Sequence, residues 1–64
     1  MQSNAELSRR IAKALSVVGL YARLDSAQNK QWVLDQVVRA LAGTPSAYKE
    51  WIADYPNWNT GVAP

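Results

Sequence analysis

The chain is 64 residues long, carries a formal net charge of +2 and contains no cysteine and no histidine. This length fits one domain, and we expect residues 1–64 to form a single helical domain. The composition excludes disulfides, leaves only carboxylates to hold zinc, which is not how zinc is normally held, and gives a smaller positive charge than most nucleic-acid-binding domains carry.

The first predicted helix covers about residues 4–24. Ser3 followed by Glu6 fits a capping box, in which each side chain satisfies a backbone N–H at the other position. Gly19 leaves open whether the helix is continuous, since glycine costs about 1 kcal/mol in a helix relative to alanine. At about 100° per residue, one apolar stripe contains Leu7, Ile11, Ala14, Leu15, Val18, Tyr21 and Ala22.

The second predicted helix covers about residues 27–42, with Asp25 or Ser26 as its N-terminal cap. Gly43 stands where a left-handed C-terminal cap belongs. Its apolar stripe, which we expect to face the core, contains Val33, Leu34, Val37, Val38 and Leu41.

The third predicted helix covers about residues 45–55. Thr44 caps it, Pro45 is tolerated at its first position, and Pro56 disfavours helical geometry at the residue before it. One face of this helix contains Tyr48, Trp51, Ile52 and Tyr55. Residues 56–64 read as an irregular tail, and Trp58 within it suggests that the tail docks. No segment alternates with period two, so we predict an all-α helical bundle of three amphipathic helices.

Trp32 lies on the side of the second helix opposite to the apolar stripe. Two explanations stay open: the third helix or the tail covers this indole, or a partner molecule does. Tryptophan and arginine are both enriched among residues that dominate interfaces. The candidate interaction residues are therefore Trp32, its polar neighbours and the tail tryptophan, namely Trp32, Asp35, Gln36, Arg39 and Trp58.

Two segments, KQWVLDQVVRALAG over residues 30–43 and YKEWI over residues 48–52, resemble small phage- or prophage-encoded proteins of uncharacterised function. The resemblance implies a bacterial, cytoplasmic setting and an accessory role, and it implies no activity. The first segment includes Trp32, Asp35, Gln36 and Arg39.

We predict that the protein is not an enzyme and holds no cofactor or metal. Catalysis needs a tuned acid, base or nucleophile, and the chain has no histidine, no cysteine and no glycine-rich phosphate loop. No stretch approaches the roughly 20 apolar residues of a membrane span, and no secretion signal begins the chain, so we expect a cytoplasmic protein.

The leading functional hypothesis is a protein-interaction or accessory module that works as a homodimer. The first helix is longer than the third, so part of its apolar stripe stays uncovered in one copy, and a second copy completes the bundle. The alternative is a weakly nucleic-acid-associated protein, whose salt-dependent phosphate contacts come from the basic first helix through Arg9, Arg10 and Lys13.

Overall fold

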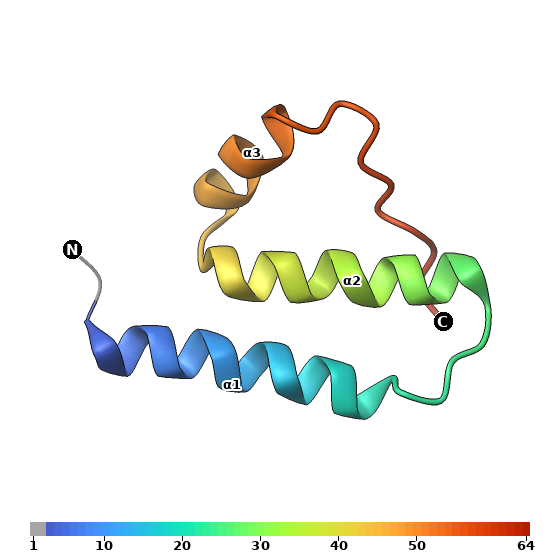
Figure 1. The fold of residues 1–64 in the computed structure, drawn as a ribbon, viewed down its shortest axis with the longest axis horizontal. Helices are drawn as coiled ribbons and strands as arrows, with labels where there is room; N and C mark the ends of the chain where they lie inside the picture. The colour runs from blue at the N-terminus through green and yellow to red at the C-terminus, as the bar shows by residue number, and fades with distance from the viewer. Residues whose placement is uncertain (1–2) are drawn as a thin grey trace.

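The computed structural model describes residues 3–64, and within them the secondary structure is entirely helical (Figure 1). The helices are α1 (Asn4–Leu20), α2 (Ala27–Ala42) and α3 (Pro45–Ala53). The prediction of an all-α fold with three helices is confirmed. No helix in this described part of the chain is long and apolar enough to cross a membrane.

Each helix begins at a side-chain cap. The hydroxyl oxygens of Ser3, Ser26 and Thr44 accept hydrogen bonds from backbone N–H groups three residues further on, at 3.1, 3.3 and 3.1 Å. These bonds satisfy donors that the first turn of a helix leaves unpaired. Gly43 ends α2 at a φ of 86°, the left-handed conformation predicted for it.

Two helix ends lie earlier than predicted. α1 ends at Leu20 rather than near residue 24, because Tyr21 leaves helical geometry and the chain forms a turn closed by the Leu24 N–H on the Tyr21 carbonyl at 3.2 Å. This turn returns the chain antiparallel to α1 (Figure 1). α3 ends at Ala53 rather than at residue 55, because the effect of Pro56 on Tyr55 terminates the helix.

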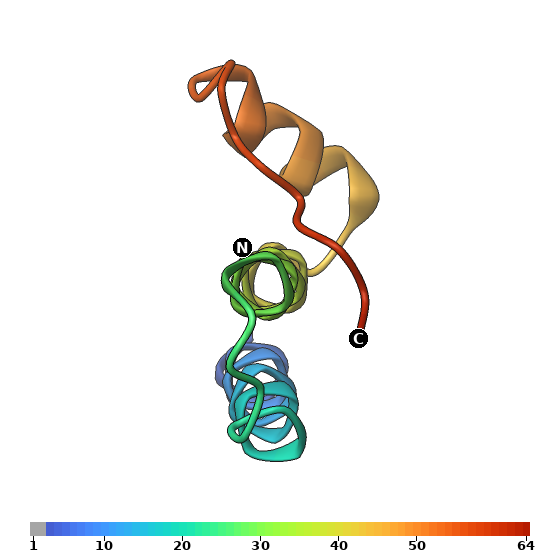
Figure 2. The same cartoon turned by 90° about the vertical axis from the view of Figure 1, so that its right-hand side faces the viewer.

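The three helices lie side by side in a single layer that is one helix thick. α2 packs against α1 on one edge and against α3 on the other, and within residues 3–64 α1 and α3 do not contact each other (Figure 2). The Cα atoms extend over 37 × 28 × 12 Å. Their radius of gyration is 12.4 Å, against about 10.7 Å expected for a compact domain of this length.

A layer of this kind buries very little. Among the described residues, the hydrophobic residues that are buried are Ala14, Ala40 and Tyr48. Stable domains are normally built from at least two packed layers, because one layer leaves both of its faces in water. In this protein the C-terminal tail covers part of one face and leaves the other face bare (Figure 2).

Candidate functional site

The covered face of α2 is organised around a buried carboxylate. Asp35 is 1% exposed. One carboxylate oxygen accepts hydrogen bonds from the Tyr48 hydroxyl and from the Trp58 indole N–H, the latter at 2.8 Å. The other oxygen accepts from Arg39 Nε at 2.7 Å. We call these four residues the Asp35 cluster; it joins α2, α3 and the tail at one point.

The hydrogen bonds of the Asp35 cluster set the protonation state of its members. Burial by itself raises the pKa of Asp35, but hydrogen bonds from Trp58, Tyr48 and Arg39, with the charge of Arg39, hold that pKa below its ordinary value. Burial raises the pKa of Tyr48, and its bond to the carboxylate adds to the rise. Arg39 also lies over the Tyr48 ring, 4.1 Å from the centroid. At neutral pH the cluster therefore holds a carboxylate, a guanidinium and a neutral phenol.

Beyond Trp58, the tail runs back along the first turns of α2. The amide nitrogens of Gln31 and Asn29 donate to the backbone carbonyls of Asn59 and Val62, at 2.6 and 2.8 Å. The Val62 N–H donates to the Gln28 carbonyl at 3.0 Å. Polar residues at the start of α2 thus satisfy the backbone groups of a segment with no secondary structure of its own.

Trp32 is half-buried between the tail and the end of α1. Gly61 lies against its backbone, and its ring meets Tyr21 edge-on with the centroids 5.0 Å apart. The contact of the tail with Trp32 is thus made at the backbone of α2. The aromatic neighbour, however, is Tyr21 of the first connection, whereas Trp58 packs edge-on against Trp51 at 5.0 Å.

The candidate interaction residues therefore divide into two groups. Asp35, Arg39 and Trp58 bind one another inside the Asp35 cluster, and Trp32 lies further along the same face under the tail. Gln36 is half-buried and is not a hydrogen-bond partner in this cluster. Most of these side chains are thus engaged by their own chain, although that of Arg39 is 48% exposed, and the larger available surface lies elsewhere.

That available surface is the opposite side of the layer. Leu34 and Leu41 of α2 lie about 160–180° around the helix from Trp32, and they are 48% and 47% exposed. On α1, the side chains that contact α2 belong to one edge of the apolar stripe, which includes the buried Ala14. Leu7, Ile11, Leu15 and Val18 of the stripe are exposed, and Val18 lines one groove together with Leu34. We define the open apolar face as Leu7, Ile11, Leu15, Val18, Leu34, Leu41 and Trp51, each at least 36% exposed.

Two shallow grooves shape the open apolar face. The first lies between α2 and α3, where Val38, Leu41, Ala47 and Trp51 line it. The second lies between α1 and α2; its lining includes Val18, Val33, Leu34 and Val37. The sequence pattern had assigned Leu34 and Leu41 to the core, but the structure places them at the surface because the buried sides of α2 are those of Ala40 and Asp35.

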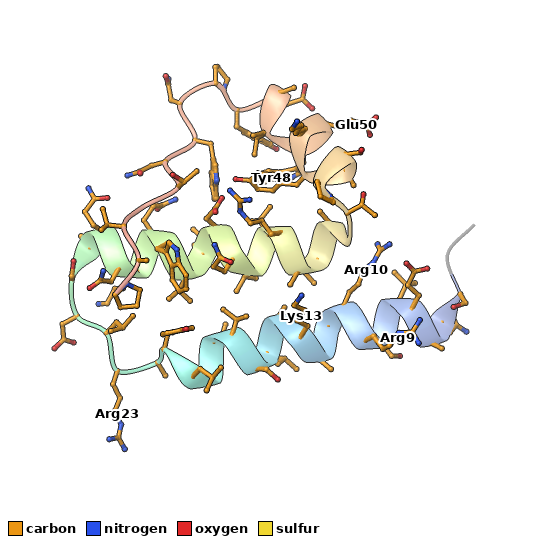
Figure 3. All side chains as sticks on the ribbon, turned by 180° about the vertical axis from the view of Figure 1, so that it is seen from behind. Arg9, Arg10, Lys13, Arg23, Tyr48 and Glu50 are labelled. Carbon is orange, nitrogen blue, oxygen red and sulfur yellow. The ribbon has the colours of Figure 1, made fainter. Side chains whose placement is uncertain are left out.

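The basic residues of α1 lie on the other side of the layer, the side of the tail. Figure 3 shows Arg9, Arg10 and Lys13 on neighbouring turns, with Arg23 pointing away from the helices. A groove here, which we call the basic groove, is lined by Glu6, Arg9, Arg10, Lys13, Arg39, Ala40 and Gly43. The structure thus brings the three predicted basic residues together and adds Arg39, which the helix pattern places beside Trp32 among the candidate interaction residues.

Among the residues that the structure describes, no group of three potential metal ligands comes together. Comparison with protein-family models, with curated proteins and with solved structures finds no match to this chain. The geometry of the two faces is therefore the basis for a functional proposal.

Proposed function

We propose that this protein is a self-associating helical interaction module, and that a second copy of the chain covers the open apolar face. The observation that carries this proposal is an uncovered apolar surface on a layer one helix thick. Pairing two such layers face to face gives each the second layer that a stable domain requires. The product is a four-helix arrangement of two α1–α2 pairs, with both copies of α3 at the edges.

The surface area of one copy supports this partner. The chain exposes 4847 Å². A compact folded monomer of its mass exposes about 4,100 Å², so the excess is roughly 750 Å². A stable two-protein interface buries about 800 Å² on each partner, which matches this excess.

The chemistry of the face also favours a second copy over an unrelated charged partner. The seven residues that define the open apolar face are uncharged, and one cation, Lys30, lines the groove between α1 and α2 on this side. An isologous dimer places the same face on both sides, so apolar surface meets apolar surface without any additional partner. The resemblance of residues 30–43 and 48–52 to small phage- or prophage-encoded proteins of uncharacterised function implies an accessory role, in which such a dimer presents its outer surfaces to other molecules.

Light scattering after size exclusion tests the proposal. At micromolar concentration we expect a mass of roughly 14 kDa, twice the 7.1 kDa of the chain, and a melting temperature that rises with protein concentration. Leu34→Glu should shift the protein toward the monomer and weaken association at least tenfold, because each dimer then buries two carboxylates at its centre.

The matched control is Leu20→Glu. Leu20 is 77% exposed and lies about 180° around α1 from Ile11, outside the open apolar face. This variant should dimerise like the unmodified chain. A mass near 7 kDa for the unmodified protein, or equal loss of dimer in both variants, would contradict the proposal.

A further inference from the structure

The net charge of the protein is concentrated in the basic groove. Four cations, Arg9, Arg10, Lys13 and Arg39, line it together with Glu6, and the carboxylate bound to Arg39 belongs to Asp35. These six side chains sum to +2, which is the formal net charge of the whole chain. The remaining charges cancel: Arg23, Lys30 and Lys49 against Asp25, Glu50 and Asp54.

The cations of the groove differ in how far their charge is already engaged. Arg10 donates to the Glu6 carboxylate at 3.0 Å, its side chain is 13% exposed, and it lies against Gly43. It also reaches the Leu41 carbonyl at 3.5 Å, at the C-terminal end of α2. Arg10 therefore holds α1 to α2, and its charge is complemented by the negative end of that helix. It is not a free anion ligand.

Arg9 and Lys13 present their charges outward. Both are exposed, and within residues 3–64 neither forms an ion pair. They are four residues apart, so they are neighbours on one face of α1. Arg39 lies across the groove on α2; its Nε donates to Asp35 and its Nη2 to the Tyr48 hydroxyl, so its charge is already paired, but its side chain is 48% exposed and its Nη1 forms no hydrogen bond within residues 3–64. Three cations from two helices thus converge on one groove.

We propose that the basic groove binds the phosphodiester backbone of double-stranded nucleic acid through Arg9, Lys13 and Arg39. Cations arranged along a groove bind the regular charges of a duplex without reading its sequence. The side chains lining the groove include no aromatic ring, and single-strand binding normally relies on aromatic stacking. The backbone of a duplex is therefore the ligand that fits. The inference does not depend on the proposed dimer, because one copy supplies the whole groove.

Fluorescence anisotropy with a labelled, mixed-sequence DNA duplex of about 20 base pairs tests this inference. The two unpaired cations predict a slope of about −1.8 in a plot of log affinity against log salt, and a full third contact from Arg39 makes it about −2.7, so affinity should fall roughly 12- to 40-fold between 50 and 200 mM. The double variant Arg9→Ala, Lys13→Ala should lose at least tenfold in affinity at 50 mM, and its slope should become shallower by about 1.8.

The control removes the same charge elsewhere. The double variant Arg23→Ala, Lys49→Ala also lowers the net charge by two, but both residues lie outside the groove. This control variant should bind the duplex like the unmodified protein. The same titration with duplex RNA in place of DNA distinguishes the two sources of phosphodiester, RNA and DNA. No binding at 50 mM salt would overturn the inference. The inference would also be overturned if both double variants lost the same affinity for the duplex, because the groove would then have no role of its own. Binding of polyglutamate as tight as that of the duplex would overturn it too, because any polyanion would then serve as the ligand.

Discussion

At the scale of single residues, the most consequential side chain is a buried aspartate. Asp35 faces three donors from three parts of the chain, and its burial is tolerable because every donor finds a carboxylate oxygen. Helix spacing alone places Asp35 and Arg39 four residues apart, as a pair on successive turns that is worth a few tenths of a kcal/mol. Tyr48 and Trp58 convert that pair into a structural junction.

We expect Asp35→Asn to lower the free energy of unfolding by about 3 kcal/mol at pH 7, because the variant leaves Arg39 without its counter-charge and turns an amide donor toward other donors. Urea unfolding followed by circular dichroism measures this loss. Glu50→Gln is the control, since Glu50 is exposed on α3 and points away from α2 (Figure 3); it should change the free energy by less than about 0.5 kcal/mol.

The same variant has a pH signature. The pKa of Asp35 is lowered in the folded protein, so its stabilising contribution is present above the unfolded value of about 3.9 and is lost as the pH falls through the folded value. The gap in stability between the unmodified protein and Asp35→Asn should therefore shrink in acid. A gap that stays constant down to about pH 2 would show that the carboxylate charge contributes nothing.

At the scale of elements, the C-terminal tail is the segment whose position depends most on one residue. Gly61 has a φ of 70°, and a Cβ atom there would overlap the backbone of Gln28 and Trp32. The backbone of a helix cannot move aside as a flexible side chain can. The tail therefore docks on α2 only because residue 61 is a glycine.

We expect Gly61→Ala to release residues 59–64 from α2 and to destabilise the protein by about 1–3 kcal/mol. Hydrogen exchange should show faster exchange at the Val62 amide, which donates to the Gln28 carbonyl. Gly19→Ala is the matched control: a Cβ at Gly19 meets nothing within 4 Å, and the residue lies in α1, so this change should stabilise the protein by up to about 1 kcal/mol. Unchanged exchange at Val62 in Gly61→Ala would contradict this account of tail docking.

At the scale of the whole molecule, the layer has two chemically different sides. Arg39 lies about 20° around α2 from Trp32, whereas Leu41 lies about 180° from it, so the basic groove and the open apolar face point in opposite directions. Closing a dimer through the apolar face turns both basic grooves outward.

The two proposals together predict that one dimer joins two duplexes. Mixing the protein with two differently labelled duplexes at low salt should give a complex that contains both labels, detected by energy transfer or by capture of one label through the other. Leu34→Glu should abolish joining while one duplex still binds, because each monomer keeps its groove. If Leu34→Glu is monomeric and still joins two duplexes, joining does not need the dimer, and the combined prediction is wrong.

Local chemistry in the sequence determined the helices: the caps at Ser3, Ser26 and Thr44, the glycine at position 43 and the proline at position 45 each act within a few residues, so their effects can be read without the fold. Tertiary structure decided which sides of the helices meet. An apolar stripe on α2 was visible in the sequence, yet α2 buries Ala40 and Asp35 and leaves Leu34 exposed. The reason is physical: an apolar pattern records which side chains avoid water, but it does not say whether their own chain or a second copy removes them from it.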